Sequence, residues 1–225
     1  MSSTARAAVA EFIASFGVVV IAAGAVIVGR DGRLDLTGVA IAYGLASAAM
    51  SHVTTPLSGG VVNPAIAAGL WATGRLGSAR AATYVLAQVL GAVAAAVLLR
   101  LLMPRSLFDA AAGGVPTLAS SIPMGKGLWI EATATFLLTF SALTARIGGS
   151  TWAAPAVTGL MVAGAVLAFF PSSGAALNPA RWFGPALVAG AWADGWVWAM
   201  GPVAGGIVAA LVHSGVYSGS EPPTP

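Results

Sequence analysis

Two Asn-Pro-Ala segments carry the most unusual chemistry of this otherwise apolar chain. The first lies within LSGGVVNPAIAAGLW and the second within SSGAALNPARWFGPA; their residues are Asn63, Pro64 and Ala65, and Asn178, Pro179 and Ala180. Asparagine is a strong N-cap and proline is favoured at the first helical position, so each segment predicts the start of a helix. The free N–H groups and the positive dipole end at such a start repel cations and offer hydrogen bonds to a neutral polar molecule.

The helices that begin at these segments are too short to cross a bilayer. We expect half-helices over residues 63–72 and 178–190, each holding roughly ten apolar residues and therefore giving about 15 Å of helix. A half-span is tolerated only where its irregular backbone is buried in protein or lines a water-filled cavity. The pattern therefore predicts two re-entrant half-helices that meet at a polar site.

The composition indicates that the rest of the chain lies in a membrane. Of 225 residues, 58% are hydrophobic and 8% are charged, whereas a typical soluble domain carries about 25% charged residues. A helix of about 20 apolar residues crosses the hydrocarbon layer. The stretches long enough to do so lie near residues 7–28, 37–55, 81–103, 127–145, 151–170 and 195–216. The first is too long for the apolar region of a signal peptide and holds Glu11, so we interpret it as a span.

The residue types also exclude several kinds of site. Cysteine is absent, which excludes disulfides, thiol chemistry and cysteine-bound metals. The ten basic residues are scattered without a basic run, so no nucleic acid partner is expected. We expect no enzyme activity, no metal and no cofactor.

The two halves of the chain repeat each other. AEFIASF in the first half matches IEATATF in the second. Gly44 precedes Asn63 by nineteen residues, and Gly159 precedes Asn178 by the same number. Each half holds three spans, and an odd number of spans gives the second half the opposite orientation in the membrane. The predicted fold is an all-α membrane protein with six transmembrane helices and two re-entrant half-helices in an inverted repeat. Its expected parts form one channel domain: a first repeat at 1–103, a connecting loop at 104–126, a second repeat at 127–217 and a disordered tail at 218–225.

On these motifs the chain resembles the aquaporins of the major intrinsic protein family, and it looks most similar to bacterial water channels through YVLAQVLGAVAAAVLL and GPALVAG. The resemblance implies a passive, proton-excluding channel whose partners are water, small neutral solutes and the lipid bilayer. It also implies one pore per protomer, a homotetramer, and a multi-pass location in the inner (plasma) membrane with cytoplasmic termini. Basic residues fall on both expected sides, so the positive-inside rule does not set the orientation.

The resemblance further implies a selectivity filter of four residues, counted from the two asparagines. These are Tyr43, Val166, Ala175 and Arg181. In this interpretation Arg181 places a fixed guanidinium at one mouth of the pore, where it donates hydrogen bonds to a passing solute and repels cations.

This chain departs from the two common filter patterns of the family. Water-selective members usually carry His at the position of Val166, and many members carry His at the position of Val61. Glycerol facilitators usually carry Asp at the position of Trp182 and an aromatic residue at that of Ala175. The set of Tyr, Val, Ala and Arg resembles members that pass water together with some ammonia or small polyol, so a channel mainly for glycerol, ammonia or another small uncharged solute is the alternative.

Glu11 and Glu131 stand at matching positions in the first and fourth spans, where a buried carboxylate is costly and usually functional. The resemblance implies that they accept hydrogen bonds from the loops before the half-helices, and proton relay is the alternative. A secondary transporter built from inverted repeats would use such groups to bind coupling ions. A structural junction protein with a blocked pore is a third possibility.

The remaining histidines and most tryptophans lie at span ends. We interpret His52 and His213 as interfacial residues, because neither has a partner of ligand type at a useful spacing for a metal. Five tryptophans are expected to form an aromatic belt at the membrane surface. They are Trp71, Trp129, Trp152, Trp196 and Trp198.

Overall fold

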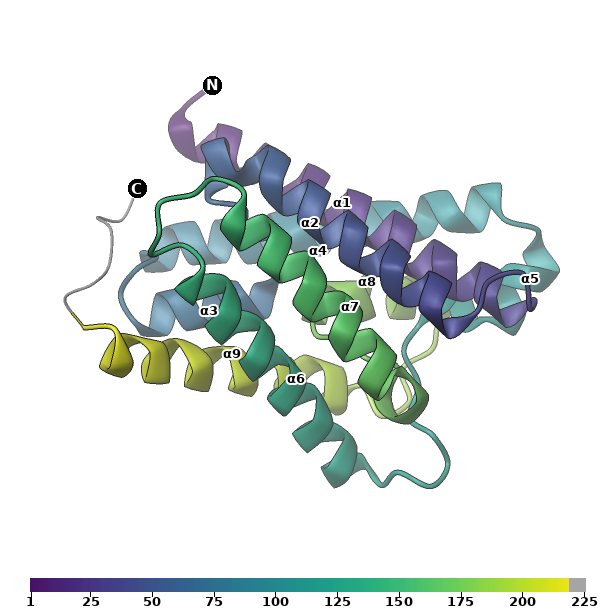
Figure 1. The fold of residues 1–225 in the computed structure, drawn as a ribbon. Coiled ribbons are helices and arrows are strands. Elements are labelled where there is room, and N and C mark those ends of the chain that lie inside the picture. The colour runs from purple at the N-terminus through teal and green to yellow at the C-terminus, as the bar shows by residue number, and fades with distance from the viewer. Residues whose placement is uncertain (219–225) are drawn as a thin grey trace.

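Six long helices form the body of the protein. The computed structural model describes residues 1–218, and all secondary structure in that part is helical (Figure 1). The long helices are α1 (Ser3–Arg30), α2 (Leu36–Ser58), α4 (Ser78–Leu102), α6 (Met124–Thr144), α7 (Ala153–Ser173) and α9 (Trp196–Val216). Each is long and apolar enough to cross a membrane. The N-terminus and the end of α9 lie at the same end of the bundle, as an even number of spans requires. The prediction of six transmembrane helices is confirmed.

Two short helices fill the space that the long ones leave. These are α3 (Pro64–Ala72) and α8 (Pro179–Ala189), which hold 9 and 11 residues and therefore reach about halfway across a bilayer. Asn63 and Asn178 are their N-caps, with extended backbone, and a proline follows at the first helical position. The tail expected at 218–225 lies outside the described residues, apart from Ser218.

The helices pack in two similar sets. In the first half α1 packs against α2 and α4, and in the second half α6 packs against α7 and α9. The half-helices cross between the sets, because α3 packs on α9 and α8 packs on α4. Helices α2 and α7 meet at Gly44 and Gly159, where a Cβ on either residue would lie 2.6 Å from the other's carbonyl oxygen. The two glycines thus let the backbones approach closely, as small residues do between membrane helices.

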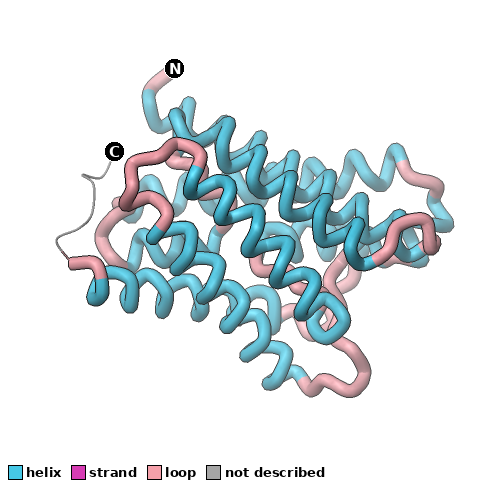
Figure 2. The backbone as a smooth tube through the Cα atoms, in the orientation of Figure 1, coloured by secondary structure: helices cyan, strands magenta, loops and turns pink. Residues whose placement is uncertain are grey.

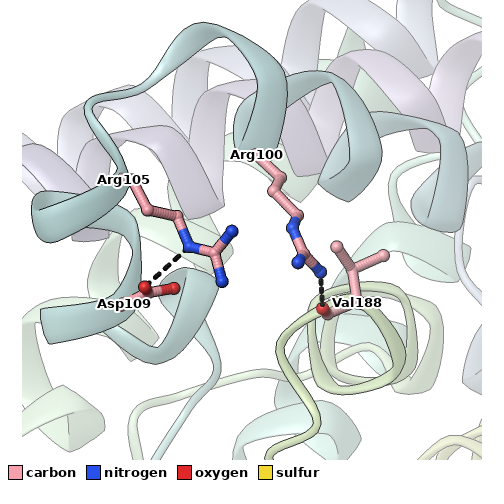
Figure 3. Close-up of polar contacts among 4 residues, drawn as sticks. All are labelled: Arg100, Arg105, Asp109 and Val188. Carbon is pink, nitrogen blue, oxygen red and sulfur yellow. Dashed lines mark hydrogen bonds and ion pairs between the residues drawn. The ribbon is translucent and has the colours of Figure 1, made fainter.

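The segment that joins the two halves is partly helical rather than a plain loop. It contains α5 (Arg105–Ala110) and the 3-10 turn η1 (Ala112–Gly114), followed by the loop that leads to α6 (Figure 2). Arg100 at the end of α4 donates to the carbonyl oxygen of Val188 in α8 over 2.9 Å, and Arg105 pairs with Asp109 over 2.7 Å (Figure 3). The first contact ties the end of α4 to the end of α8, whereas the second is an exposed pair one turn apart within α5.

Two of the expected surface residues are buried instead. Four of the five tryptophans are exposed, but Trp198 has 1% of its surface exposed and donates its indole N–H to the carbonyl oxygen of Ser173 over 2.8 Å. His213 is also 1% exposed, and its ring lies beside Phe140 and Tyr217. The prediction was wrong for both residues because each lies on the face of α9 that packs inward. A position near a span end does not reveal which face of the helix that is.

Candidate functional site

The two asparagine caps meet at the centre of the protein. Each Oδ1 accepts a hydrogen bond from the first turn of its own helix, from Ala65 N for Asn63 and from Ala180 N for Asn178, both over 2.9 Å. Each Nδ2 then donates across to the other half. Asn63 donates to the carbonyl oxygen of Leu177 over 2.8 Å, and Asn178 donates to that of Val62 over 3.1 Å. Each amide therefore has a second N–H to offer to a molecule between the two helix starts.

The loop before each half-helix has a strained backbone. Val62 and Leu177, the residues directly before the asparagines, both have φ of 58°, and Ala175 has φ of 42°. This left-handed region is unfavourable for residues with a side chain, above all for a β-branched one such as Val62. Such a conformation persists only where surrounding contacts fix it.

The two buried glutamates supply those contacts. Glu11 accepts from Val61 N over 3.1 Å and from Val62 N over 2.7 Å. Glu131 accepts from Ala176 N over 3.0 Å and from Leu177 N over 2.8 Å. Both side chains are 0% exposed. Each carboxylate thus binds two consecutive backbone N–H groups and holds the carbonyl oxygens of its loop toward the centre.

A further set of polar residues supports the loops, and no motif in the sequence indicates most of them. Gln88 donates to Glu11 over 2.6 Å, while Ser173 donates to Glu131 over 2.7 Å. At the matching ends of α2 and α7, Tyr84 binds the carbonyl oxygen of Ser58 and Trp198 binds that of Ser173. Ser58 and Ser173 each stand five residues before their asparagine, a repeat that could have pointed to these positions.

A small cavity lies between the asparagines. Its volume is about 20 Å³, which is room for about one water molecule. Its lining residues are Val18, Tyr43, Ser47, Val61, Val62, Asn63, Ile66, Leu138, Thr158, Val162, Leu177 and Asn178. Most are apolar, with amide and hydroxyl groups at a few points, so a polar molecule meets few hydrogen-bonding partners here.

The four expected filter residues lie close together on the side of the second half-helix. Tyr43, Val166 and Ala175 belong to one buried cluster, and the guanidinium carbon of Arg181 lies 5.9 Å from the centre of the Tyr43 ring. The Tyr43 hydroxyl donates to the carbonyl oxygen of Ala176 over 2.6 Å. The group therefore combines one cation, one aromatic face and two small apolar side chains.

Arg181 is held by a residue that the sequence analysis did not anticipate. Its Nη1 donates to the carbonyl oxygen of Gly114 over 2.8 Å, although the side chain is only 1% exposed. Gly114 belongs to η1 in the connecting segment and has φ of 78°, which favours glycine. The Nε of Arg181 has no hydrogen-bond partner in the described residues. The guanidinium is thus positioned from one side and keeps donor capacity for a solute.

Cavities and loops of different character lie at the two mouths. Beside the Arg181 mouth is a larger cavity of about 420 Å³, lined in part by Arg30, Asp35 and residues of the connecting segment. At the opposite end, Arg146 donates to the carbonyl oxygen of Gly59 over 2.8 Å, and burial lowers the pKa of this guanidinium from its ordinary value.

His52 stacks on Trp152 with 3.6 Å between ring centres. No group of three or more His, Asp or Glu that could hold a metal ion occurs within residues 1–218.

Comparison with known proteins agrees with this geometry. The family model described as major intrinsic protein matches residues 1–213, nearly the whole chain. The chain belongs to the major intrinsic protein family. Aquaporin TIP4-4 of Zea mays is 41% identical over 96% of this chain and 90% of its own length. Aquaporin-4 of Mus musculus is 32% identical over 94% of this chain and 67% of its own length.

A solved structure shows the same fold. The X-ray structure of the aquaglyceroporin from Plasmodium falciparum matches with a TM-score of 0.86 and 20% identity, covering 96% of this chain and 97% of its own. As a member of the major intrinsic protein family, the protein is a multi-pass membrane protein and a passive channel for water and small solutes. The two relatives come from a plant and an animal, so the expected likeness to bacterial water channels stays a prediction.

Proposed function

We propose that the pore conducts water while it excludes protons and cations, and that Asn63, Asn178 and Arg181 impose this selectivity. The observation that carries the proposal is the pair of asparagine caps, each of which uses one N–H for the opposite loop. The N-termini of α3 and α8 meet at the same place and add their positive dipole ends.

The asparagine pair acts on the water molecule that sits between the helix starts. Its oxygen accepts from the remaining N–H groups of Asn63 and Asn178, so both of its hydrogens point outward to neighbouring waters. A central water with this orientation cannot accept a proton from either side, because its lone pairs are already occupied. The dipole ends raise the cost of a cation at the same point. Water therefore passes without carrying protons.

The filter selects by charge and by size. Arg181 repels cations and donates hydrogen bonds, while Tyr43 narrows the passage with its ring. Val166 and Ala175 offer little bulk and no side-chain hydrogen bond. A solute with some apolar surface gives up fewer hydrogen bonds to water when it enters such a filter, so its barrier is lower here than at a filter that contains histidine. This favours a second permeant class of small uncharged molecules: ammonia passes readily, and glycerol passes slowly.

The two glutamates serve as scaffold rather than as ion sites. Every oxygen of both carboxylates accepts at least one hydrogen bond, mostly from loop backbone. A carboxylate so occupied has little capacity left for a coupling ion. This argues against an ion-coupled transporter and supports passive flow.

Our proposal for the larger assembly is drawn from the family resemblance and not from contacts of the single chain. We infer one channel domain made of two inverted repeats, 1–103 and 127–217, that forms a homotetramer with one pore per protomer. The protein lies in the plasma membrane with both termini in the cytoplasm, carries no cofactor and is not an enzyme.

Purified protein in liposomes tests the proposal. Osmotic shrinkage should be much faster than in protein-free liposomes, and Asn63→Ala or Asn178→Ala should lower water permeability at equal protein density. Thermal unfolding in detergent separates a loss of conduction from a loss of fold. Shrinkage no faster than in protein-free liposomes, for a protein that is folded, would contradict a water channel.

A further inference from the structure

The central cavity shows the internal symmetry of the chain residue by residue. Tyr43 stands twenty residues before Asn63, and Thr158 stands twenty before Asn178; both line the cavity. Eight of the other ten lining residues pair across the two halves: Ser47 with Val162, Val62 with Leu177, Asn63 with Asn178, and Val18 with Leu138. Val61 and Ile66 line the cavity without their counterparts, Ala176 and Arg181. The repeat therefore places a counterpart of Tyr43 on the far side of the asparagine pair.

The change of residue type is largest three positions after each asparagine, where an apolar residue is replaced by a charged one. In the first half this residue is Ile66, which lines the cavity. In the second half it is Arg181, which does not line it and is held by Gly114 in the connecting segment. Ile66 is 4% exposed and lies in the first turn of α3. On the side of the first half-helix, the branched apolar side chain of Ile66 thus narrows the lumen. On the side of the second half-helix, the charge of Arg181 lies outside the cavity lining.

Thr158 differs from the other hydroxyl groups of the cavity in how it is used. The Tyr43 hydroxyl donates to Ala176 O over 2.6 Å, and the Ser47 hydroxyl donates to Tyr43 O over 2.9 Å. No such hydrogen bond ties the Thr158 hydroxyl within residues 1–218, and the side chain is half-buried in the lining of the cavity. Of these three hydroxyl groups, that of Thr158 therefore keeps its O–H to donate to a molecule in the lumen, whereas the other two can only accept.

We propose that Ile66 and Thr158 form a second, uncharged selectivity element, in series with the Arg181 filter and on the other side of the asparagine pair. Ile66 limits the width of a passing solute, and the Thr158 hydroxyl replaces one hydrogen bond of its hydration. The element therefore acts against larger polar solutes such as glycerol, whereas Arg181 acts against cations. The inference rests on the proposed function, because it assumes that this lumen conducts.

Two barriers in series make a distinctive prediction. The resistances of successive constrictions add, so widening one of them raises solute flux only until the other limits it. Val166→Ala widens the first filter, and Ile66→Ala widens the proposed second element. The pair of substitutions should then raise glycerol permeability by more than the product of the two single effects.

The experiment measures glycerol and water permeability of liposomes that hold the parent protein, each single variant and the double variant at equal protein density. We expect Ile66→Ala added to Val166→Ala to raise glycerol permeability about threefold or more, with Ile66→Val and the exposed Leu90→Ala as controls that change it little. Equal glycerol permeability for Val166→Ala and the double variant, both folded and conducting water, would overturn the proposal. A parent protein that conducts no water would instead overturn the proposed function.

A second variant tests the hydroxyl without changing the shape of the lumen. Thr158→Val keeps the volume and removes one hydrogen-bonding group, so water permeability should fall about threefold, the effect of one lost hydrogen bond of modest strength. Thr158→Ser keeps the hydroxyl and should retain the permeability of the parent. Equal water permeability in Thr158→Val and the parent would show that this hydroxyl does not serve the permeant molecule.

Discussion

The loops before the two half-helices share their scaffold and differ in what they offer to a solute. Both have an asparagine cap that donates across the centre, and both have a buried glutamate that binds two consecutive N–H groups. They differ three residues after the asparagine, where one half has Ile66 and the other has Arg181. The contacts that fold the junction are thus duplicated by the repeat, while the contacts that select the solute are not.

The arginines at the two mouths of the pore are also held by different contacts. Arg181 is anchored from outside its own repeat, by Gly114 in the connecting segment. At the other mouth Arg146 binds the carbonyl oxygen of Gly59 at the end of α2. The connecting segment has no counterpart in the repeat, so it adds a charged filter to one mouth without altering the shared scaffold.

The largest expected effect follows from removing a shared scaffold residue. Glu131→Ala leaves two buried N–H groups and the Ser173 hydroxyl without their acceptor, at a cost of about 3 kcal/mol or more. Glu11→Ala should cost a similar amount, because its carboxylate holds the matching N–H groups and Gln88. Thermal unfolding in detergent measures both, and Glu131→Gln, which keeps one acceptor oxygen, should fall between Glu131→Ala and the parent. If Glu11→Ala left the thermal stability nearly unchanged while Glu131→Ala lowered it strongly, the two loops would not share the same scaffold.

The next effect concerns the charge that only one half carries. Arg181→Val should raise cation leak clearly above that of the parent while water flux survives, because the guanidinium excludes cations by its field. Sodium or potassium flux into liposomes measures the leak. Arg30→Val removes a charge from the larger cavity at the same mouth and serves as the matched control. If Arg181→Val leaked cations no faster than the parent, the role of Arg181 would be structural, through its contact with Gly114.

A smaller effect is expected from the apolar filter residue. Val166→His should lower the ratio of glycerol to water permeability about tenfold, which corresponds to about 1.4 kcal/mol of additional barrier for the larger solute. Histidine adds bulk, which hinders glycerol more, and a hydrogen-bonding group, which water can use. Parallel shrinkage assays for water, glycerol and ammonia at equal protein density give the ratio. If the ratio stays constant, Val166 does not face the passage.

Much of the fold was predictable from the sequence because the bilayer allows few solutions. A run of apolar residues long enough to span must form a helix, and Asn-Pro marks a helix start by local chemistry alone. Glu11 and Glu131 stood out because carboxylates are rare in spans. Their positions beside the loops came only from the family resemblance.

The missed features depend on contacts between distant segments. Gly114 binds Arg181 through a backbone carbonyl, which every residue has, so no residue type indicated it. Gln88 and Trp198 bind their partners because they lie on the inward faces of their helices. Packing decides which face of a helix points inward, so the sequence does not indicate it. Thr158 is an ordinary residue on its own, and only its place in the lining of the cavity gives it a role.

The central claim is that the asparagine pair lets water pass and stops protons, and one measurement on the parent protein tests it most directly. Liposomes that hold the protein and an internal pH dye are given an osmotic gradient, and then a pH gradient with a potassium diffusion potential. Water permeability well above that of protein-free liposomes, with proton entry no faster than in those liposomes, is the predicted result. A proton flux that rises with protein density alongside the water flux would contradict the account.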